Sequence, residues 1–483
     1  MNSLYKKLFF NLIIFLPIIT IILFIFCFNN QKVLTYTLDD PYIHLTVGKN
    51  ILFGNYGINL KEFSSPSSSI LFPFLLAPFS IFFFYEYIPL VINIICLLLT
   101  INVFDLIFSH YPYVQRKIFI FFLAIFSNLY GLIFTGLEHN LQILLISYAF
   151  YRFVHFSDKK KIFLYTALIL IPLVRYEGLA ISLPILLSLY AQNEKKNSTL
   201  SLFLIVIILS LFSFFLIYNG GRILPASVIA KASLGFHTLI DNFLSNIKYH
   251  WAVFILTLLI VFKLYRINKK KYAFVLLSTT FLHFFFGKYG WFSRYEVYYI
   301  IFFLLFLFNF CLKQYWYLIF FVPLVLPNLL AATIKTPLAS SNIYNQQYQI
   351  GEIVKILNAN VAVNDLGIVS LKNTKFTLDL WGLGSLEAQN FRRNVSEHKE
   401  NWIEELMNKK EVNYAIIYDS WFPEKPNNWI KSGEISLLQR SILIGTRVSF
   451  YSVGENNNKI MKKILLNYKV DNISKNFKII INQ

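Results

Sequence analysis

The stretch Leu38-Asp39-Asp40-Pro41-Tyr42-Ile43-His44 stands just after the first long apolar run of a chain that is 56% hydrophobic and contains 51 phenylalanines. Several further apolar runs approach the roughly 20 residues that a helix needs to cross a bilayer. The composition therefore predicts a polytopic α-helical membrane protein. Two adjacent carboxylates are unexpected there, because the chain has only 25 acidic residues and a carboxylate at the bilayer centre costs roughly 3 kcal/mol. Asp39 and Asp40 must therefore face water, a cation or a substrate.

Eleven apolar runs are candidate membrane spans. They lie near residues 9–28, 88–108, 118–134, 137–155, 162–174, 178–191, 200–218, 251–265, 272–286, 295–312 and 315–334. The first run lacks a small-residue cleavage site and is interpreted as a retained span. The stretch Ile70–Tyr85 is also apolar, but Pro73, Pro78 and the preceding serines favour a helix that lies in the membrane interface or re-enters the membrane. A twelfth span is the rival interpretation of that stretch.

The basic residues predict the orientation in the membrane. With eleven spans and a cytoplasmic N-terminus, every compact basic cluster falls on the cytoplasmic side, as such loops should. These clusters are Lys6-Lys7, Arg116-Lys117, Lys159-Lys160-Lys161, Lys195-Lys196, Arg266 with Lys269-Lys270-Lys271, and Lys313. A twelfth span would scatter them over both sides. The net charge of +19 is therefore read as a topology signal of a cytoplasmic membrane protein and not as a sign of nucleic-acid binding.

The composition changes after about residue 335. Residues 1–335 are the predicted transmembrane module, in which residues 29–87 form the first outer loop. Pro337-Leu338-Ala339-Ser340-Ser341 reads as a linker, and residues 336–483 have the size of one soluble domain on the outer side. The pattern there predicts an α/β domain. Its expected strands are Val361–Val363, Phe376–Leu378, Tyr414–Tyr418 and Arg447–Val453, and its expected helices are Gln349–Leu357 and His398–Lys409.

Five connections on the predicted outer side carry unusual polar segments. They contain Asp39-Asp40, Thr135–His139, Arg175–Gly178, Asn219–Pro225 and Gly287–Glu296. Convergence of acids and bases on one membrane face predicts a site, although each segment also has a plainer interpretation.

The plainer interpretation of Asp40-Pro41 is the start of a helix with Asp40 as its N-cap. An amphipathic helix would follow, flat on the membrane, with Tyr42, Leu45, Val47, Ile51 and Leu52 on one face. Asp39-Asp40 can also pair with a nearby lysine.

The other acids have simple roles as well. Glu138 can act as a helix-terminal acid, and Arg175 with Glu177 can form a mutual ion pair.

Arg222, Lys231, Lys288 and Arg294 are outer-face cations in apolar or aromatic surroundings. Anionic lipid headgroups or a bound phosphate would each explain them. Carboxylates and cations beside lipid suit a substrate linked to a lipid phosphate. Outside the cytoplasm no nucleotide donor is expected, so an activated sugar would have to arrive on a lipid.

These segments resemble a known superfamily. The first loop supplies Asp39–Ile43, Asn50–Leu52, Gly54–Gly57, Ser65–Ser69 and Leu75–Pro78, and later parts supply Thr135–His139, Arg175–Gly178, Leu224-Pro225 with Ala230-Lys231, Arg294-Tyr295, Asn364–Gly367 and Leu378–Leu383. In this order they resemble the GT-C superfamily of polyprenyl-phosphate-dependent glycosyltransferases, and most of all the branch that contains the mycobacterial terminal arabinofuranosyltransferases. The chain departs from that branch where Arg175-Tyr176-Glu177 replaces Arg-Pro-Glu and Leu224-Pro225-Ala226 replaces Leu-Pro-Asn.

The resemblance implies a GT-C-like fold and a membrane enzyme that moves a sugar from a polyprenyl phosphate to a glycan, lipid or protein acceptor. An acidic residue of the first outer loop would be catalytic, with Asp40 as first choice and Asp39 as second. By the same resemblance, Glu138, Glu177 and His139 are expected in the sugar pocket, and Arg175, Lys231, Lys288 and Arg294 at the phosphate. A divalent cation serves some members of the superfamily, and nothing in this sequence demands one.

Two rival functions remain open at the level of sequence. A transporter or flippase of lipid-linked saccharides would use similar substrates, but such proteins place polar sites near the bilayer midplane. The predicted spans are nearly free of charge at mid-depth, which favours the enzyme. The second rival is a relative of the transferases that binds glycan without catalysis.

Overall fold

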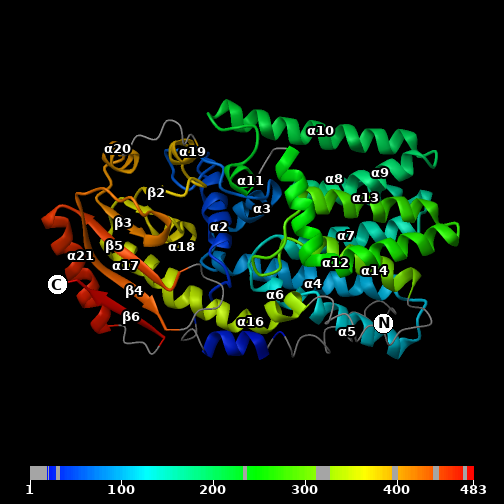
Figure 1. The fold of residues 1–483 in the computed structure, drawn as a ribbon, viewed down its shortest axis with the longest axis horizontal. Helices are drawn as coiled ribbons and strands as arrows, with labels where there is room; N and C mark the ends of the chain where they lie inside the picture. Colours follow the sequence, from blue (N-terminus) through cyan, green and yellow to red (C-terminus); the bar gives the residue numbers. More distant parts are fainter. Residues whose placement is uncertain are drawn as a thin grey trace.

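The structure is a computed structural model that describes residues 19, 21–28, 33–231, 236–311, 327–393, 401–438, 445–471 and 476–482. A bundle of helices forms one half of the molecule and a mixed α/β region forms the other (Figure 1). Helix α2 (Asp40–Ile51) stands between the two halves. The predicted combination of a mainly helical part and a C-terminal α/β part is therefore confirmed.

The helical half extends from α2 to α16 along the chain. Its further elements are α3 (Leu71–Leu76), η1 (Ala77–Phe79), η2 (Tyr85–Tyr87), α4 (Ile88–Ile107), α5 (Tyr113–Phe126), α6 (Leu129–Ile133), α7 (His139–Val154), η3 (Asp158–Lys160), α8 (Lys161–Val174), η4 (Tyr176–Gly178), α9 (Leu179–Tyr190), α10 (Lys195–Tyr218), α11 (Ala226–Lys231), α12 (Phe236–Arg266), α13 (Lys270–Phe286), α14 (Val297–Phe310) and α16 (Pro327–Ile343).

The helix bundle has two chemically different ends. At one end, Lys271 donates to Oε1 of Gln192 at 3.0 Å, and Lys161 pairs with Glu194 at 3.3 Å. These contacts gather the lysine-rich connections that precede α8, α10 and α13. The opposite end holds the start of α7, the end of α8, the start of α9, the end of α13 and the start of α14. Each of these five helices therefore runs between a lysine-rich end and an end that carries the polar segments.

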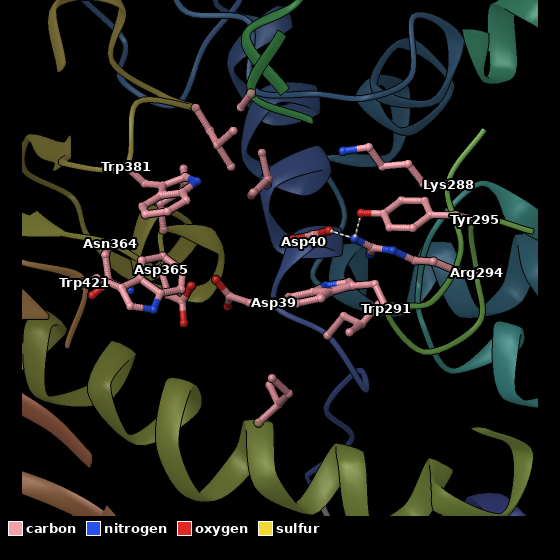
Figure 2. Close-up of a pocket in the computed structure, with 16 residues that line it drawn as sticks. Asp39, Asp40, Lys288, Trp291, Arg294, Tyr295, Asn364, Asp365, Trp381 and Trp421 are labelled. Atoms are coloured by element: carbon pink, nitrogen blue, oxygen red, sulfur yellow. Dashed lines mark hydrogen bonds and ion pairs between the residues drawn. The ribbon is translucent and has the colours of Figure 1, made fainter. Parts of the chain in front are cut away.

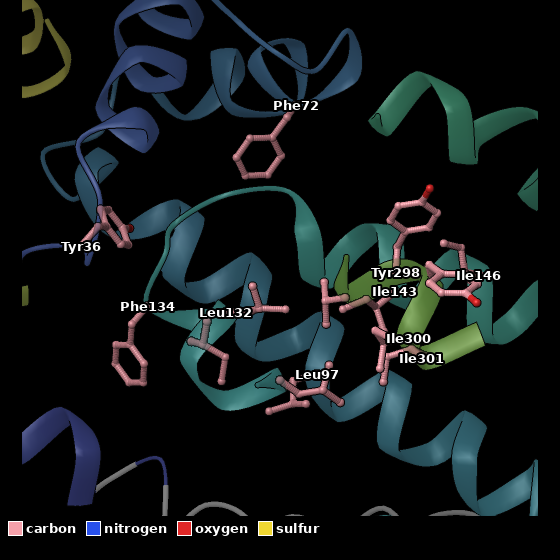
Figure 3. Close-up of a cluster of buried hydrophobic side chains, with 14 of the residues drawn as sticks. Tyr36, Phe72, Leu97, Leu132, Phe134, Ile143, Ile146, Tyr298, Ile300 and Ile301 are labelled. Carbon is pink, nitrogen blue, oxygen red and sulfur yellow. The ribbon is translucent and has the colours of Figure 1, made fainter. Parts of the chain in front are cut away.

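Much of the apolar sequence is buried inside this bundle. All residues of α14 from Val297 to Phe306 are buried. Figure 3 shows Tyr298, Ile300 and Ile301 of α14 in one cluster with side chains of α4 and α7. An apolar run is consistent with burial against protein as well as with contact with lipid.

Three helical segments among the described residues are long and apolar enough to cross a membrane, and they are Tyr85–Ile107, Lys195–Tyr218 and Thr238–Arg266. This is far fewer than the eleven spans predicted. The runs expected at 118–134, 137–155, 162–174, 178–191, 272–286 and 295–312 form helices of 12 to 17 residues. Such helices are shorter than the roughly 20 residues of a typical span. The runs at 9–28 and 315–334 lie largely outside the described residues.

Between Ile70 and Tyr85 the chain forms only the short helices α3 and η1, with Pro73 inside the first turn of α3 and Pro78 inside η1. This stretch is too short to span a bilayer, as predicted. Ile81, Phe82, Phe83 and Phe84 are exposed just before α4, so this segment presents large apolar side chains next to the first long apolar helix.

Helix α2 differs from its prediction. It is buried almost all round, so the expectation of an amphipathic helix with a water-facing side is wrong. Its polar side chains are bonded within the protein: His44 to Oγ of Ser67 at 3.0 Å, Thr46 to Oγ of Ser370 at 3.0 Å, and Asn50 to the backbone of Gly57. The polar face of α2 therefore meets protein instead of solvent.

The prediction of a linker at residues 337–341 is also wrong. Residues 337–341 lie inside α16, which continues through a π-helical turn, η6 (Tyr344–Tyr348), into α17 (Gln349–Leu357). Pro337 is tolerated within this helix, and Ser340 bonds reciprocally with Thr35 through Oγ and backbone oxygens. Tertiary contacts thus override a composition that is typical of a linker.

The α/β region contains one six-stranded mixed sheet in the order β2-β1-β3-β5-β4-β6. The strands β2, β1 and β3 are parallel, and β5, β4 and β6 add antiparallel neighbours. Its elements are β1 (Val361–Val363), α18 (Gly367–Lys372), β2 (Thr377–Asp379), α19 (Leu386–Arg393), α20 (Trp402–Lys409), β3 (Tyr414–Ile417), η8 (Asp419–Trp421), β4 (Trp429–Leu437), β5 (Arg447–Val453), α21 (Glu455–Asp471) and β6 (Phe477–Ile481).

The four predicted strands and the helix Gln349–Leu357 are confirmed, with shifts of one residue at the ends of β2 and β3. The helix expected at 398–409 begins at Trp402, and residues 398–400 lie outside the described part. The strands β4 and β6 and the helix α21 were not predicted.

The close contact between the two halves predicts that a substitution of Gly367 lowers the stability of the protein. A Cβ atom there would overlap the backbone oxygen and the carboxyl group of Asp39. We expect Gly367→Ala to destabilise the protein by about 1–3 kcal/mol through overpacking, measured as thermal unfolding of the purified full-length chain. The control is Gly454→Ala. The backbone there is left-handed, but no atom lies within 4 Å of the added Cβ, so the loss of stability should stay near 1 kcal/mol. Equal losses in the two variants would contradict a close junction.

Candidate functional site

A cavity of about 470 Å³ lies where the helical half meets the α/β region (Figure 2). Seven parts of the chain line it: the first loop with the start of α2, the end of α11, the connection between α13 and α14, the end of α16, and the three loops that follow β1, β2 and β3. Segments far apart in sequence therefore meet around one space.

Three parallel strands direct their carboxyl ends toward this cavity. β1 is followed by Asn364 and Asp365, β2 by Trp381, and β3 by Trp421, and all four residues line the cavity. Open α/β sheets bind ligands in the crevice outside the carboxyl ends of their strands. The sheet therefore supplies one wall of a crevice of this kind.

Asp39 joins the two halves. Its carboxylate accepts hydrogen bonds from the backbone N–H groups of Gly367 at 2.6 Å and Ile368 at 2.9 Å, at the start of α18. Burial raises the pKa of Asp39, and these two N–H groups oppose the rise. Asp39 also occupies the N-cap position of α2 without a side-chain cap bond, and Asp40 is the first helical residue. The predicted N-cap role of Asp40 is therefore wrong.

Asp40 points into the cavity from the next position of the chain (Figure 2). Its Oδ2 accepts a hydrogen bond from Nη2 of Arg294 at 2.5 Å, and its side chain remains 34% exposed while that of Arg294 is 2% exposed. The buried guanidinium favours the ionised carboxylate. The two adjacent aspartates thus differ: Asp39 is bound by backbone amides, and Asp40 faces open space.

Asp365 is a third carboxyl group at this edge. It is partly buried next to Asp39 and accepts a hydrogen bond from Nε2 of Gln347 at 2.8 Å. Burial raises the pKa of Asp365 well above its ordinary value, and the neighbouring charge of Asp39 raises it further. Both effects favour the protonated acid.

The loop that carries Arg294 is strained. Trp291, Phe292 and Ser293 are three consecutive non-glycine residues with positive φ angles of 49°, 66° and 52°. Each such residue costs roughly 1–2 kcal/mol, and strain of this kind gathers at functional sites. The carboxylate of Glu296 accepts the N–H of Gly290 at 2.9 Å and closes the loop. The strained backbone presents Trp291 and Arg294 to the cavity.

A second charged cluster lies beside this one. Arg175 donates from Nη1 to Glu138 and from Nη2 to Glu177, each at 2.7 Å. The predicted Arg175–Glu177 ion pair is therefore confirmed. Glu138 is fully buried and also approaches His44, whose Nε2 lies 3.5 Å from Oε2 of Glu138. His44 stands one turn after Asp40 on α2, so the same helix contributes to both clusters.

A second cavity, of about 260 Å³, adjoins the Arg175 cluster. Arg175 and Glu177 line it together with apolar side chains of α11, α12 and α13. Lys288 and Tyr295 line both cavities. The ring of Tyr295 also lies under the guanidinium groups of Arg175 and Arg294, with centroid distances of 5.9 and 5.0 Å. Tyr295 therefore separates the two spaces and contacts both arginines.

Lys288 differs from the two arginines. Arg175 and Arg294 are each neutralised by carboxylates, whereas Lys288 is exposed and forms no ion pair with any residue that the structure describes. Lys288 lines both cavities, and its ammonium group is not neutralised by a carboxylate of the described residues, so it can pair with an anionic ligand.

The remaining predicted residues lie at different depths. His139 is fully buried at the start of α7, and neither His139 nor Glu138 lines a cavity, but Glu138 contacts Arg175 and Ser68, which line the second one. The side chain of Lys231, at the end of α11, lies outside the described part of the chain. The structure thus brings Asp39, Asp40, Lys288 and Arg294 to one cavity, as the sequence suggested.

The sequence led to no site role for the aromatic residues of the cavity, although Trp291, Tyr295 and Trp381 stand in segments that were singled out. Trp381 and Trp421 lie with ring centroids 4.2 Å apart, and the guanidinium of Arg392 sits 3.5 Å from the ring centre of Trp381. Asp365 received no role either, although Asn364–Gly367 is one of the segments that carry the resemblance. Trp381, Trp421 and Asp365 all follow predicted strands that the structure shows to be parallel, and position at the carboxyl ends of such strands is the signal that would have given them a role.

No metal site is apparent in the part of the chain that the structure describes, where no three His, Cys, Asp or Glu side chains gather as ligands would.

A family model for a domain of unknown function (DUF8728) matches residues 341–451. This segment begins near the end of α16 and contains Asn364, Asp365, Trp381 and Trp421, so it covers the α/β wall of the cavity. Asp40, Lys288 and Arg294 lie outside it. No curated protein matches the chain.

The buried ion pair predicts a large effect of removing Arg175. In Arg175→Met, Glu138 keeps its buried position but loses its closest counter-charge, and we expect a loss of about 3–5 kcal/mol in the free energy of unfolding. Glu177→Gln is the matched control, because that carboxylate is 26% exposed, and it should cost about 1 kcal/mol or less. The double variant Arg175→Met with Glu138→Leu should recover most of the stability, since the fully buried charge of Glu138 is gone and Glu177, which also loses Arg175, is 26% exposed. Failure to recover would contradict this account.

Proposed function

We propose that the protein is a membrane-embedded glycosyltransferase of the GT-C type, which transfers a sugar from a polyprenyl-phosphate donor to the hydroxyl group of a glycan, lipid or protein acceptor. The observation that carries the proposal is the pairing of two cavities that share Lys288 and Tyr295. One of them holds Asp40 and aromatic rings, and the other is bounded by apolar helices. A donor with a lipid tail, a phosphate and a sugar needs such neighbouring environments.

In the proposed reaction, the acceptor oxygen attacks the anomeric carbon, and the bond between that carbon and the phosphate oxygen breaks. The electron pair leaves with the phosphate, and the acceptor proton passes to Asp40 as general base. A single displacement of this kind inverts the anomeric configuration. The phosphodiester becomes a monoester and gains negative charge, so a cation near the departing oxygen lowers the barrier.

Lys288 and Arg294 are the cations that suit this step. Lys288 has no counter-charge among the described residues, and Arg294 has its Nε and Nη1 buried without a hydrogen-bond partner there. In the proposal, Arg294 holds Asp40 ionised through Nη2 and offers its other N–H groups to the phosphate. Asp39 is committed to the N–H groups of α18, which supports Asp40 over Asp39 as the base.

The two ends of the bundle support the proposed orientation. Lysine-rich loops favour the cytoplasmic side, and they gather at the end remote from the polar segments. We propose that the cavity and the α/β region face the outer side of the cytoplasmic membrane. In this proposal, α7, α8, α9, α13 and α14 cross the membrane together with the three longer segments, although at about 1.5 Å per residue they reach only about 18–26 Å.

The position of the cavity favours an enzyme over a transporter. Substrate sites of transporters lie near the bilayer midplane between helix repeats, whereas this cavity lies beyond one end of the bundle, against the sheet.

The first test of this proposal is Asp40→Asn. Loss of a general base should lower transfer by about 10²–10⁴-fold, while membrane insertion stays normal. The measurement is the surface glycan of a deletion strain that carries the wild-type or variant gene, with protein level and membrane insertion measured in parallel. Asp158→Asn, an exposed acid at the lysine-rich end, is the control and should restore the glycan fully. A normal glycan from correctly inserted Asp40→Asn protein would overturn the role of Asp40.

The second test concerns the leaving phosphate. We expect Lys288→Gln to lower the rate of sugar transfer by about 10²–10³-fold, because one donor to the developing charge is lost. Lys288→Arg should retain most of the activity. The assay follows release of polyprenyl phosphate in membranes of the same strains. Lys49→Gln, an exposed lysine on α2, serves as the control, and an equal effect of both glutamine variants would exclude a specific role for Lys288.

A further inference from the structure

The α/β wall of the main cavity contains a rigidly held tryptophan. The carboxylate of Asp379 accepts the N–H groups of Trp381, Leu383 and Gly384 at 2.6–2.8 Å. Gly382 has a φ of +90°, and a Cβ atom there would overlap the backbone of Gln389. These contacts fix the loop after β2 in one conformation.

The side chain of Trp381 is fixed as well. Nη1 of Arg392 donates to the backbone oxygen of Trp381 at 2.9 Å, and the guanidinium covers its ring. Trp381 remains only half-buried, and with Trp421 it lines the cavity opposite Trp291, which is 49% exposed (Figure 2). Ring surface is thus held open to the cavity from both halves of the molecule.

A hydrogen-bond donor lies beside these rings. Oδ1 of Asn364 accepts the N–H of Tyr418 at 2.8 Å, which fixes the orientation of the amide. Its Nδ2 is buried and has no partner among the described residues, although the residue is only 4% exposed and lines the cavity. An unsatisfied buried donor of this kind costs about 1–3 kcal/mol, and a bound hydroxyl group would satisfy it.

The packing of Trp381 alone does not account for this arrangement. Trp381 belongs to neither buried apolar cluster of the described residues, and it is held by the ring of Trp421 and by the polar contact with Arg392. A large ring fixed beside a cavity, with an adjacent amide donor, suits a ligand that has both an apolar C–H face and hydroxyl groups. Sugars combine these two properties.

We infer that Trp381, Trp421 and Asn364 form a saccharide-binding subsite for the acceptor, so that the substrate class of the acceptor is a glycan and not a simple lipid or an unmodified protein. This inference rests on the proposed function, because that function makes this cavity the place where acceptor and donor meet. It also gives the α/β region a role: it holds the terminal sugar of the acceptor against Asp40.

The experiment uses the purified full-length protein and the surface glycan extracted from the deletion strain as probe. Calorimetric titration measures binding, and transfer assays in membranes give the acceptor KM and kcat. We expect Trp381→Ala and Trp421→Ala each to weaken glycan binding about tenfold and to raise KM with little change in kcat. Trp381→Phe should keep most of the affinity.

The matched control is Trp429→Ala, since Trp429 is also half-buried in the α/β region but packs on Tyr451 away from the cavity. Thermal unfolding identifies variants that fail to fold. Wild-type affinity in folded Trp381→Ala and Trp421→Ala, or no glycan binding by the wild-type protein, would overturn the subsite. Glycan binding that depends on both tryptophans without any sugar transfer by the wild-type protein would support the subsite and defeat the proposed transferase function.

Discussion

Two backbone N–H groups at the start of α18 bind the carboxylate of Asp39, and the rest of the site depends on this contact. It joins the first loop to the α/β region. Any side chain at position 367 would displace Asp39, because a Cβ atom there would overlap the backbone oxygen of Asp39. Because Asp39 is held on that side, the next residue, Asp40, projects the other way toward Arg294. Of the two neighbouring aspartates, Asp39 thus fixes the α/β region and Asp40 presents a partly exposed carboxylate.

Much of this organisation could be predicted from composition and position. The apolar runs indicated a helical half, and the strands β1, β2, β3 and β5 followed from short β-branched runs. The two aspartates stood out because acids are scarce in this chain. The Arg175–Glu177 pair followed from spacing alone, whereas the closer burial of Glu138 against Arg175 needed the packing of α7 on α8.

The failures have physical causes. Apolar runs do not give the length of the helix that they form, so six of the eleven runs predicted as spans contain helices of only 12 to 17 residues. The burial of α2 depends on partners such as Ser370, more than 300 positions away. The strand β4 contains Gly433 at an irregularity of its pairing with β5, which hides its alternation. No role was predicted for Trp381 and Trp421, because only the order of the strands in the sheet brings them together at the cavity.

The unbroken passage from α16 through η6 into α17 has a mechanical consequence. A flexible linker would let the α/β region swing as a hinged body, but a continuous helix resists bending, and the Asp39 contact fixes the same region at a second point. A body held at two separated points has little freedom to rotate. The two walls of the cavity therefore keep a fixed spacing, and the width of the opening between them is set by packing and not by a hinge motion.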